Sequence, residues 1–553
     1  MTATVIPRIA LGFSLAFCAL APASAQDIFV TNAKGYGFQE GVLSRFDSLL
    51  VRDGHVAAAG PAAVITPYAE GVARYDAKGA VVLPGLIDAH GHVFGLGFQA
   101  LQIDLADTGS LDVALDRIRA SARDGKGWLM GRGWNQVVWG LGRFPTAKEL
   151  DGATRHRPAY FARVDGHAAW VNSRALEVAG ITRATPDPQG GRIERDDSGA
   201  PTGVLVDAAM ALVADKIPPP SMADNRAALA AALRAIAAVG LTGVHDAGVT
   251  PAQWAVYQEF AADGRLTARI YGMIAGAGAA FDALAAGGPI VAMAKDRLAL
   301  RAVKLYADGA LGSRGAALLA PYSDDAGNRG LLFHDDVALR NQMARALSRG
   351  FQVNVHAIGD AANRQVLDAF AVLLRHDGRD LRHRIEHAQV VAPEDMPRFA
   401  ALEVIASMQP VHATSDKNMA QDRLGPQRIK GAYAWRSLLA AGARLAAGSD
   451  FPVEPANPFY GIHAAVTRRD RAGVPPEGWY KDEALTVAEA LKAFTLDAAF
   501  AGFAEDRLGS LEPGKWADFI LIDRDIFAID PEDIWKTKVL ETWVGGARVY
   551  QAE

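Results

Sequence analysis

Six side chains able to bind or bridge metal ions lie at the ends of short apolar runs in this chain. His90 and His92 end the run VVLPGLIDAHGH, and residues two apart in a β-strand point to the same side. The other four follow later runs: Lys304 in VKLYADG, His356 in VNVHAIG, His387 in RIEHAQ and Asp450 in LAAGSD. Neutral imidazoles suit zinc and similar divalent ions. The HxH spacing alone fits a metal site, but it also fits two polar side chains on the protein surface. The strands and helices that carry the six residues must distinguish these two interpretations.

The middle of the chain alternates apolar strands with helical segments that end in glycine, such as NRAALAAALRAIAAVG and DVALRNQMARALSRG. Strands are predicted over 80–90, 241–248, 268–274, 301–309, 351–360, 383–389, 403–410 and 443–450. This alternation predicts an α/β fold, namely a (β/α)8 TIM barrel. Catalytic groups of such barrels lie at the carboxyl ends of the strands, where the six residues fall. Because buried polar groups cost free energy unless they are paired or bind metal, this placement favours a metal site.

Short alternating strands with glycine turns occupy both ends of the chain, in DIFVTNAKGYG near the start and GSLEPGKWADFILIDRD near the end. They predict a small β-sandwich domain built from both termini. We expect residues 26–84 to form its first part, 85–504 the barrel and 505–553 its second part. The long stretch between the first two barrel strands predicts a large insertion over about 95–240, because simple connections are much shorter.

Residues 1–25 have the pattern of a secretory signal peptide. Arg8 precedes an apolar run from Ile9 to Leu20, and Ala23-Ser24-Ala25 fits a cleavage site. We therefore expect a periplasmic or secreted protein without a stable membrane anchor; an uncleaved anchor is the alternative. Cys18 is the only cysteine of the chain and would leave with the signal. That loss would exclude disulfides, thiolate ligands and cysteine nucleophiles from the mature protein.

The charge balance is mildly acidic, with a formal net charge of -5 and 22% charged residues. The sequence has no long basic run, which argues against a nucleic-acid partner. A small-molecule substrate is the expected partner, and a homo-oligomer stays an open alternative.

Several stretches of the chain together resemble the amidohydrolase superfamily. They are LPGLIDAHGH, RGWNQ, DGHAAWVNSRAL, GVHDAG, VKLYADGALGSR, VNVHAIGD, RIEHAQ, AAGSDFPVEPANPF and LGSLEPGKWADFILID, in the expected order over nearly the whole mature chain. The chain is most similar to the amidohydrolase 3, or YtcJ-like, family, which includes N-substituted formamide deformylases. That family often has a TGVLxE pattern, whereas this chain has TGVLVD. The shorter acidic residue, Asp207, puts any role at this position in doubt.

The resemblance implies a centre of two divalent metal ions, zinc by default. The implied ligands are His90 and His92 for the first ion, His356 and His387 for the second, and Lys304 and Asp450. Lys304 would be carboxylated and bridge both ions, because a lysine ammonium has no lone pair to offer and a carbamate supplies oxygen ligands. A plain ion pair between Lys304 and Asp308 is the alternative. Asp450 would ligate the first ion and serve as the catalytic proton carrier, unless it only caps the turn that follows it.

The implied function is that of an exported metal-dependent hydrolase of a carbon–nitrogen amide-type bond, in an N-acyl, N-formyl or related small amide. A metal-bound hydroxide would attack the carbonyl, and Asp450 would pass the proton to the leaving nitrogen as general base and acid. An esterase, lactonase or carbamate hydrolase would use the same centre. An isomerase or deaminase of the same barrel and a non-catalytic metal- or ligand-binding protein are more distant alternatives.

Five further residues are predicted to contact the substrate: Trp134, His167, Trp170, Arg314 and His412. The insertion that holds three of them is rich in tryptophan and glycine, which favours an aromatic or apolar substrate portion. The tryptophans could instead pack inside the insertion, and Arg314 could instead neutralise Asp308. His245 in GVHDAG is predicted to be a structural polar contact or part of the pocket lining.

Overall fold

The computed structural model describes residues 25–122, 127–164, 166–188, 190–375 and 378–553. The predicted signal peptide lies almost wholly outside these ranges. Within them, the helices are all too short or too polar to cross a membrane.

Eight parallel strands form the barrel, as the sequence predicted, and β17 (Ile290–Met293) adds a short antiparallel strand to the same sheet. In chain order they are β8 (Leu86–Gly91), β15 (Leu241–Val249), β16 (Arg269–Ala275), β18 (Leu298–Tyr306), β19 (Gln352–Ala357), β20 (Arg384–His387), β21 (Ile405–Met408) and β22 (Leu445–Ala447). Each pairs in parallel with its neighbours in that order. The strands are almost entirely buried, which explains why they read as continuous apolar runs.

The first and last strands meet just beyond the end of β22, which closes the barrel. The Asp450 backbone N–H donates to the His90 carbonyl at 2.7 Å, and the His92 N–H donates to the Phe451 carbonyl at 2.7 Å. The buried Asp88 carboxylate accepts from the Ser449 hydroxyl at 2.6 Å. This seam places the segment around Asp450 directly against the HxH segment.

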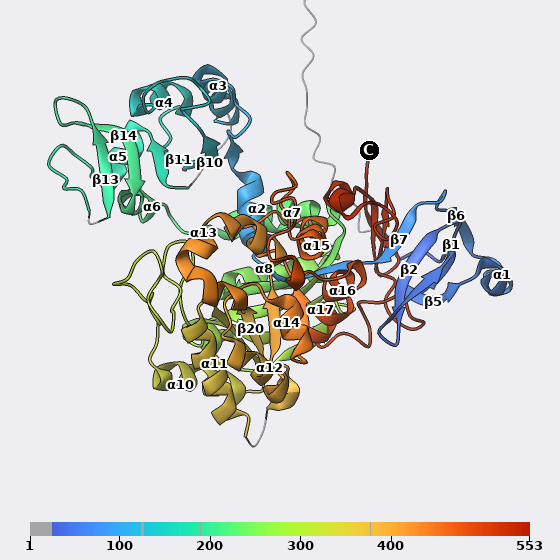
Figure 1. Ribbon diagram of the computed structural model, residues 1–553. Helices are drawn as coiled ribbons and strands as arrows, with labels where there is room; N and C mark the ends of the chain where they lie inside the picture. The colour runs from blue at the N-terminus through green and yellow to red at the C-terminus, as the bar shows by residue number, and fades with distance from the viewer. Residues whose placement is uncertain (1–24, 123–126, 165, 189, 376–377) are drawn as a thin grey trace, which may run out of the picture.

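Helices cover the outside of the strands (Figure 1). They include α7 (Met222–Ala238), α8 (Pro251–Ala262), α10 (Asp336–Leu347), α11 (Asp360–Leu373), α12 (Met396–Leu402), α14 (Trp435–Ala440), α16 (Val487–Ala493) and α17 (Leu496–Ala501). Helix α7 starts at a capping box in which Ser221 and Asp224 satisfy each other's backbone N–H groups. Such caps fix the residue at which a covering helix begins.

Both chain ends contribute to one sandwich, which confirms the predicted fold class. Strand β7 (Val81–Pro84) pairs with β2 (Lys34–Gln39) on one side and with β23 (Phe519–Ile522) on the other. The sheet continues through β24 (Val539–Val544) and β25 (Ala547–Gln551) at one end and β3 (Val42–Phe46) at the other. The opposing sheet contains β1 (Ile28–Thr31), β4 (Ser48–Arg52), β5 (His55–Gly60) and β6 (Ala73–Asp76). Residues of both sheets share one apolar core.

The stretch 80–90, predicted as one strand, is two strands that belong to different sheets. Strand β7 lies in the terminal sandwich and β8 in the barrel, and Gly85 separates them. A Cβ at Gly85 would lie 2.3 Å from the Thr242 hydroxyl oxygen, so the crossing from sheet to sheet leaves no room for a side chain. Apolar patterning cannot reveal this break, because both strands are fully buried.

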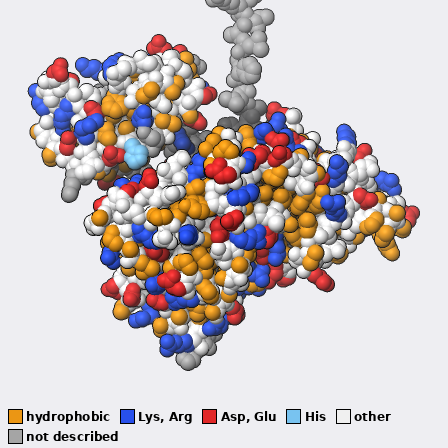
Figure 2. Space-filling view, viewed as in Figure 1, with side chains coloured by type: hydrophobic (Ala, Val, Ile, Leu, Met, Phe, Trp, Pro, Cys, Tyr) orange, Lys and Arg blue, Asp and Glu red, His pale blue; other side chains and the backbone are white. Residues whose placement is uncertain are grey.

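The insertion forms a lobe between α2 (Val93–Leu101) and α7. Its sheet has the order β13-β14-β12-β11-β10-β9, with strands Gly191–Arg195, Pro201–Asp207, Ala168–Val171, Ala159–Arg163, Leu129–Trp134 and Ile103–Asp104. Two apolar cores of its own hold the lobe together. It projects from one side of the barrel, and the terminal sandwich lies on the other (Figures 1 and 2).

A buried ion pair joins the barrel to the sandwich and gives a test of this arrangement. Arg269 donates to both carboxylate oxygens of Asp518, at 2.6 and 2.8 Å. We expect Arg269→Ala to lower the free energy of unfolding by about 3–5 kcal/mol, because Asp518 would stay buried without its partner. Urea unfolding would measure this loss. Arg119→Ala, which breaks an exposed pair with Asp116 on α3 (Leu111–Ser121), should leave the midpoint unchanged; equal losses would contradict the prediction.

Candidate metal centre and its pocket

The barrel brings all six predicted metal ligands to the carboxyl end of its strands. His90 lies in β8 and His92 just after it, Lys304 lies near the end of β18, His356 in β19, His387 at the end of β20, and Asp450 just after β22. This is the face of the barrel that carries the site in enzymes of this architecture. All six residues therefore lie at or near the carboxyl ends of barrel strands, while their role as metal ligands stays a prediction.

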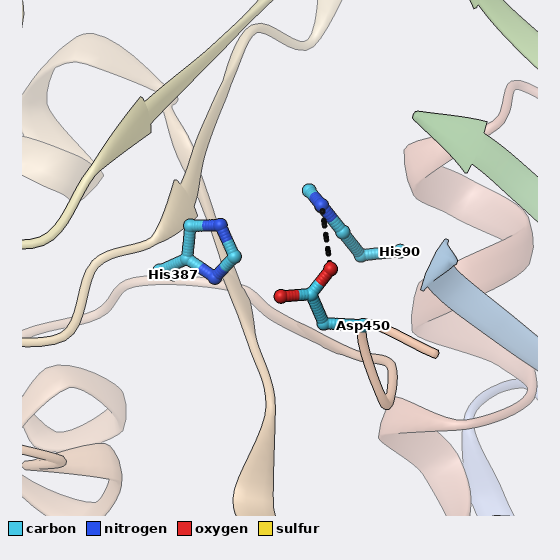
Figure 3. Close-up of side chains that lie close together, drawn as sticks. All are labelled: His90, His387 and Asp450. Carbon is cyan, nitrogen blue, oxygen red and sulfur yellow. Dashed lines mark ion pairs between the residues drawn. The ribbon is translucent and has the colours of Figure 1, made fainter. Parts of the chain in front are cut away.

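Asp450 is the point on which the first two histidines converge. Its Oδ1 lies 3.1 Å from Nε2 of His92 and 3.6 Å from Nε2 of His90. One ligand atom each from His90, His387 and Asp450 lies within 4.8 Å of the others (Figure 3). Burial alone would raise the pKa of Asp450, but the hydrogen bond from His92 and the neighbouring imidazoles hold this pKa well below its usual value. Asp450 is therefore a carboxylate, the form that binds metal.

Lys304 is buried inside this cluster rather than paired with an acid. Its Nζ lies 3.0 Å from Nε2 of His90. Among the described residues no ion pair joins it to Asp308, whose carboxylate instead accepts the backbone N–H groups of Ala317, Ile358 and Gly359. Burial lowers the pKa of Lys304 to about 8, which increases the share of neutral amine. The neutral amine is the form that can take up carbon dioxide as a carbamate.

His356 and His387 form the other side of the cluster, with ring centres 4.6 Å apart. Nδ1 of His387 lies 2.7 Å from Oε1 of Gln409, which leaves Nε2 as the available ligand atom. Nε2 of His356 is buried without a hydrogen-bond partner. Burial first, and then the charge of Lys304, lower the pKa of His356 to about 3, so its imidazole is neutral. An unpartnered, neutral imidazole nitrogen beside a carboxylate is what a divalent ion requires, and this donor set fits such an ion.

Two of the candidate ligands have a left-handed backbone. The φ angle is 74° at His387 and 61° at Asp450, values that side chains with a Cβ rarely adopt. Strained residues persist where the surrounding structure overdetermines them. At Asp450 the seam hydrogen bond to His90 supplies that constraint.

The cluster opens into a cavity of about 400 Å³. The remaining lining is Tyr306, Ala310, Leu311, Gly312, Ile358, Gln389, His412, Asp416, Val453 and Glu454. His412 comes from α13 (Pro410–Arg428), and its Nε2 lies 3.8 Å from Oδ2 of Asp450. The sequence singled out His412 but missed Gln389, Asp416 and Glu454. Gln389 and Glu454 follow two of the metal motifs closely, a signal that was available, whereas Asp416 lies in a polar helix without one.

The other predicted substrate contacts lie elsewhere in the structure. Trp134 and Trp170 are fully buried in the core of the insertion, where they donate to the Phe161 and Thr146 carbonyls. Packing therefore accounts for both indoles, and a substrate could not reach them without opening that core.

Arg314 and His167 are ion-paired outside the cavity lining. Arg314 binds Asp324 at 3.0 Å and does not neutralise Asp308. His167 lies on the exposed surface of the insertion, with Nδ1 2.8 Å from Asp207. Of the five predicted contacts, the described cavity lining includes His412 alone.

Comparison with known proteins identifies relatives over most of the chain. The model of the amidohydrolase family "Amidohydro_3" matches residues 74–550. The chain is 36% identical over 482 residues to "Putative amidohydrolase YtcJ" of Bacillus subtilis (strain 168), covering 86% of this chain and 90% of that protein. It is 30% identical over 495 residues to the N-substituted formamide deformylase of Arthrobacter pascens, covering 86% and 89%. An uncharacterized metal-dependent hydrolase from Pyrococcus horikoshii OT3 superposes with a TM-score of 0.77 at 28% identity, covering 91% of this chain and 99% of that one.

The donor set predicts the metal content of the protein. We expect about two divalent ions per chain, as in two-metal hydrolytic sites, and a marked loss in Lys304→Ala because the bridging group would be gone. Elemental mass spectrometry of protein made with zinc supplied would measure this. Lys515→Ala is the matched control, since Lys515 is also buried but is paired with Glu512 in the sandwich. Equal metal in all three proteins would contradict a bridging role for Lys304.

Proposed function

The chain belongs to the amidohydrolase family, and we propose that it is a hydrolase of carbon–nitrogen bonds in small N-acyl or N-formyl amides. The observation that carries this proposal is the convergence of four histidines, a buried lysine and an ionised carboxylate at the mouth of the barrel. Burying these polar side chains costs free energy unless they have partners. Core packing therefore does not explain the set, and bound metal ions do.

The proposed ligands divide into two groups. His90, His92 and Asp450 would hold one ion, His356 and His387 would hold the other, and a carboxylated Lys304 would lie between them. When bound, such ions polarise a carbonyl and lower the pKa of a water molecule. No serine or cysteine nucleophile is then needed.

We infer that Asp450 moves the proton. It is ionised and its Oδ2 faces His412 across 3.8 Å, at the wall of the cavity. A carboxylate there can accept the proton of the attacking water and return it to the leaving nitrogen, which is general base and acid catalysis. Nε2 of His412 is buried without a hydrogen-bond partner, so it is available to a polar atom of the substrate.

The charges of the cavity support a preference among amides. Its lining holds the carboxylates of Asp416 and Glu454, and Lys304 is the only lysine or arginine in the lining described. The nearby guanidinium groups of Arg314 and Arg423 both bind Asp324. Apart from the proposed metal ions, an anionic substrate would therefore meet two acidic side chains and find no arginine or free lysine in the lining described. Neutral or basic amides with a short acyl group are the proposed substrates, in keeping with the formamide deformylase among the relatives.

Export is part of the proposal and is supported by the N-terminal pattern alone. The basic residue Arg8, the apolar run and Ala23-Ser24-Ala25 fit a cleaved signal. N-terminal sequencing of the protein produced in a bacterial host should find a chain that begins at Gln26. A chain that begins near Met1 would contradict export by this route.

The reaction is tested with a matched amide and ester. We expect the zinc-loaded protein to release benzylamine from N-benzylformamide, and Asp450→Asn to lower kcat by about 10²–10⁴-fold, the usual size of acid–base catalysis. Asp470→Asn, which changes a carboxylate outside the cavity lining, should leave kcat unchanged. Turnover of benzyl formate without turnover of the amide would replace the proposed amidase by an esterase.

The charge preference is tested at Glu454. We expect N-formylglycine to be a much poorer substrate than N-benzylformamide, because its carboxylate meets two acids in the cavity. Glu454→Gln should raise kcat/KM for N-formylglycine several-fold and change it little for the neutral amide, since one charge of about 1 kcal/mol at a partly exposed site is removed. Equal changes for both substrates would show that Glu454 does not select by charge.

A further inference from the structure

A pair of opposite charges is buried directly behind the metal centre. Arg384 and Glu386 lie on β20 in the stretch RIEH, and both are 0% exposed. They are two residues apart, so their side chains point to the same side of the strand, and neither lines the cavity. The proposed reaction uses His387 from this stretch and leaves both charged residues without a role.

Glu386 reaches a ring nitrogen of a proposed metal ligand. Its Oε2 lies 2.5 Å from Nδ1 of His90. An ionised carboxylate can only accept a hydrogen bond, so Nδ1 carries the proton and Nε2 keeps its lone pair. That Nε2 is the atom near Lys304 and Asp450, at 3.0 and 3.6 Å. The contact therefore selects both the tautomer and the orientation that a metal ligand needs.

Arg384 holds the carboxylate in place. Its Nε lies 2.8 Å from Oε1 of Glu386, and its Nη2 donates to Oε2 at 3.0 Å. The same guanidinium donates to the Ser407 hydroxyl at 2.8 Å, and its Nη1 lies 2.8 Å from Nδ1 of His245. It thereby ties β20 to β21 and β15. The pair is neutral as a whole, which limits the cost of burying it.

We propose that Glu386 is a positioning residue of the metal centre: it orients the His90 ring and makes it a stronger ligand, while Arg384 fixes and neutralises the carboxylate. This inference rests on the proposed function, because it requires that His90 bind an ion. A purely structural ion pair between Arg384 and Glu386 would not need the ring nitrogen of His90. Partners of this kind behind metal-bound histidines raise ligand basicity, and their loss costs about 10–100-fold in metal affinity.

The test measures zinc affinity of the full chain by competition with a chromophoric chelator. Glu386→Gln keeps the shape of the side chain and an oxygen that can accept from Nδ1, but removes the charge. We expect zinc binding to weaken by about 10–100-fold. Glu541→Gln is the control, because Glu541 is also buried and hydrogen-bonded, to Tyr75 and Trp543 in the sandwich. It should bind zinc like the wild type, and equal affinity in all three proteins would overturn the proposal.

Measuring Glu386→Gln in the His90→Ala variant as well as in the wild type separates an effect through His90 from general destabilisation of the protein. If Glu386 acts through His90, Glu386→Gln should change zinc affinity less than about twofold when His90→Ala is already present, because contacting residues are not additive. The same loss in both backgrounds would overturn the proposal. Should Glu386→Gln not yield folded protein, Glu386→Asp keeps the charge but withdraws it from Nδ1. Weakened zinc binding in that variant supports the proposal and unchanged binding overturns it.

The outcomes also distinguish this inference from the proposed reaction. A wild-type chain that binds no zinc overturns both. A chain that binds zinc but hydrolyses no amide removes the proposed reaction and leaves the role of Glu386 standing. A chain that hydrolyses amides with unchanged zinc affinity in Glu386→Gln overturns the role of Glu386 alone.

Discussion

The seam between the first and last barrel strands is the constraint on which the site depends. The hydrogen bond from the Asp450 N–H to the His90 carbonyl joins segments that are far apart in the chain, and Asp88 with Ser449 reinforces it. A barrel left open at this edge would separate the carboxylate from the HxH pair. Closure of the barrel therefore also brings the candidate metal ligands together.

The carboxyl end of the barrel is a polar region inside an apolar shell, and its charges are matched locally. Asp308 is satisfied by three backbone N–H groups, and Glu386 by Arg384 and His90. In the described structure Lys304 lies against an imidazole nitrogen, Nε2 of His90 at 3.0 Å, rather than an acid. Nε2 of His356 makes no hydrogen bond and lies 3.7 Å from Oδ1 of Asp308. Because incompletely paired buried polar groups are costly, we expect an additional charged group, the proposed metal ion, to bind beside these two residues.

The structure also moves the expected substrate determinants from the insertion to the barrel. Trp134, Trp139 and Trp170 of the insertion pack in its own apolar core. A lobe that projects from the barrel needs such a core to be stable. The cavity wall instead comes from loops after the barrel strands and from α13, which supplies His412 and Asp416. We therefore expect substrate selection in this chain to depend on side chains within reach of the proposed metal ligands.

The sequence by itself determined the barrel, the sandwich shared by both termini and the location of six candidate ligands, because strand periodicity and motif order are local properties. The tertiary structure decided which side chains are in contact. It split the stretch 80–90 at Gly85, buried Trp134 and Trp170, and paired Arg314 with Asp324 rather than Asp308. It also brought Glu386 to His90 across 296 positions of sequence. Contacts between distant segments depend on how the sheet closes and packs, and no local pattern encodes that.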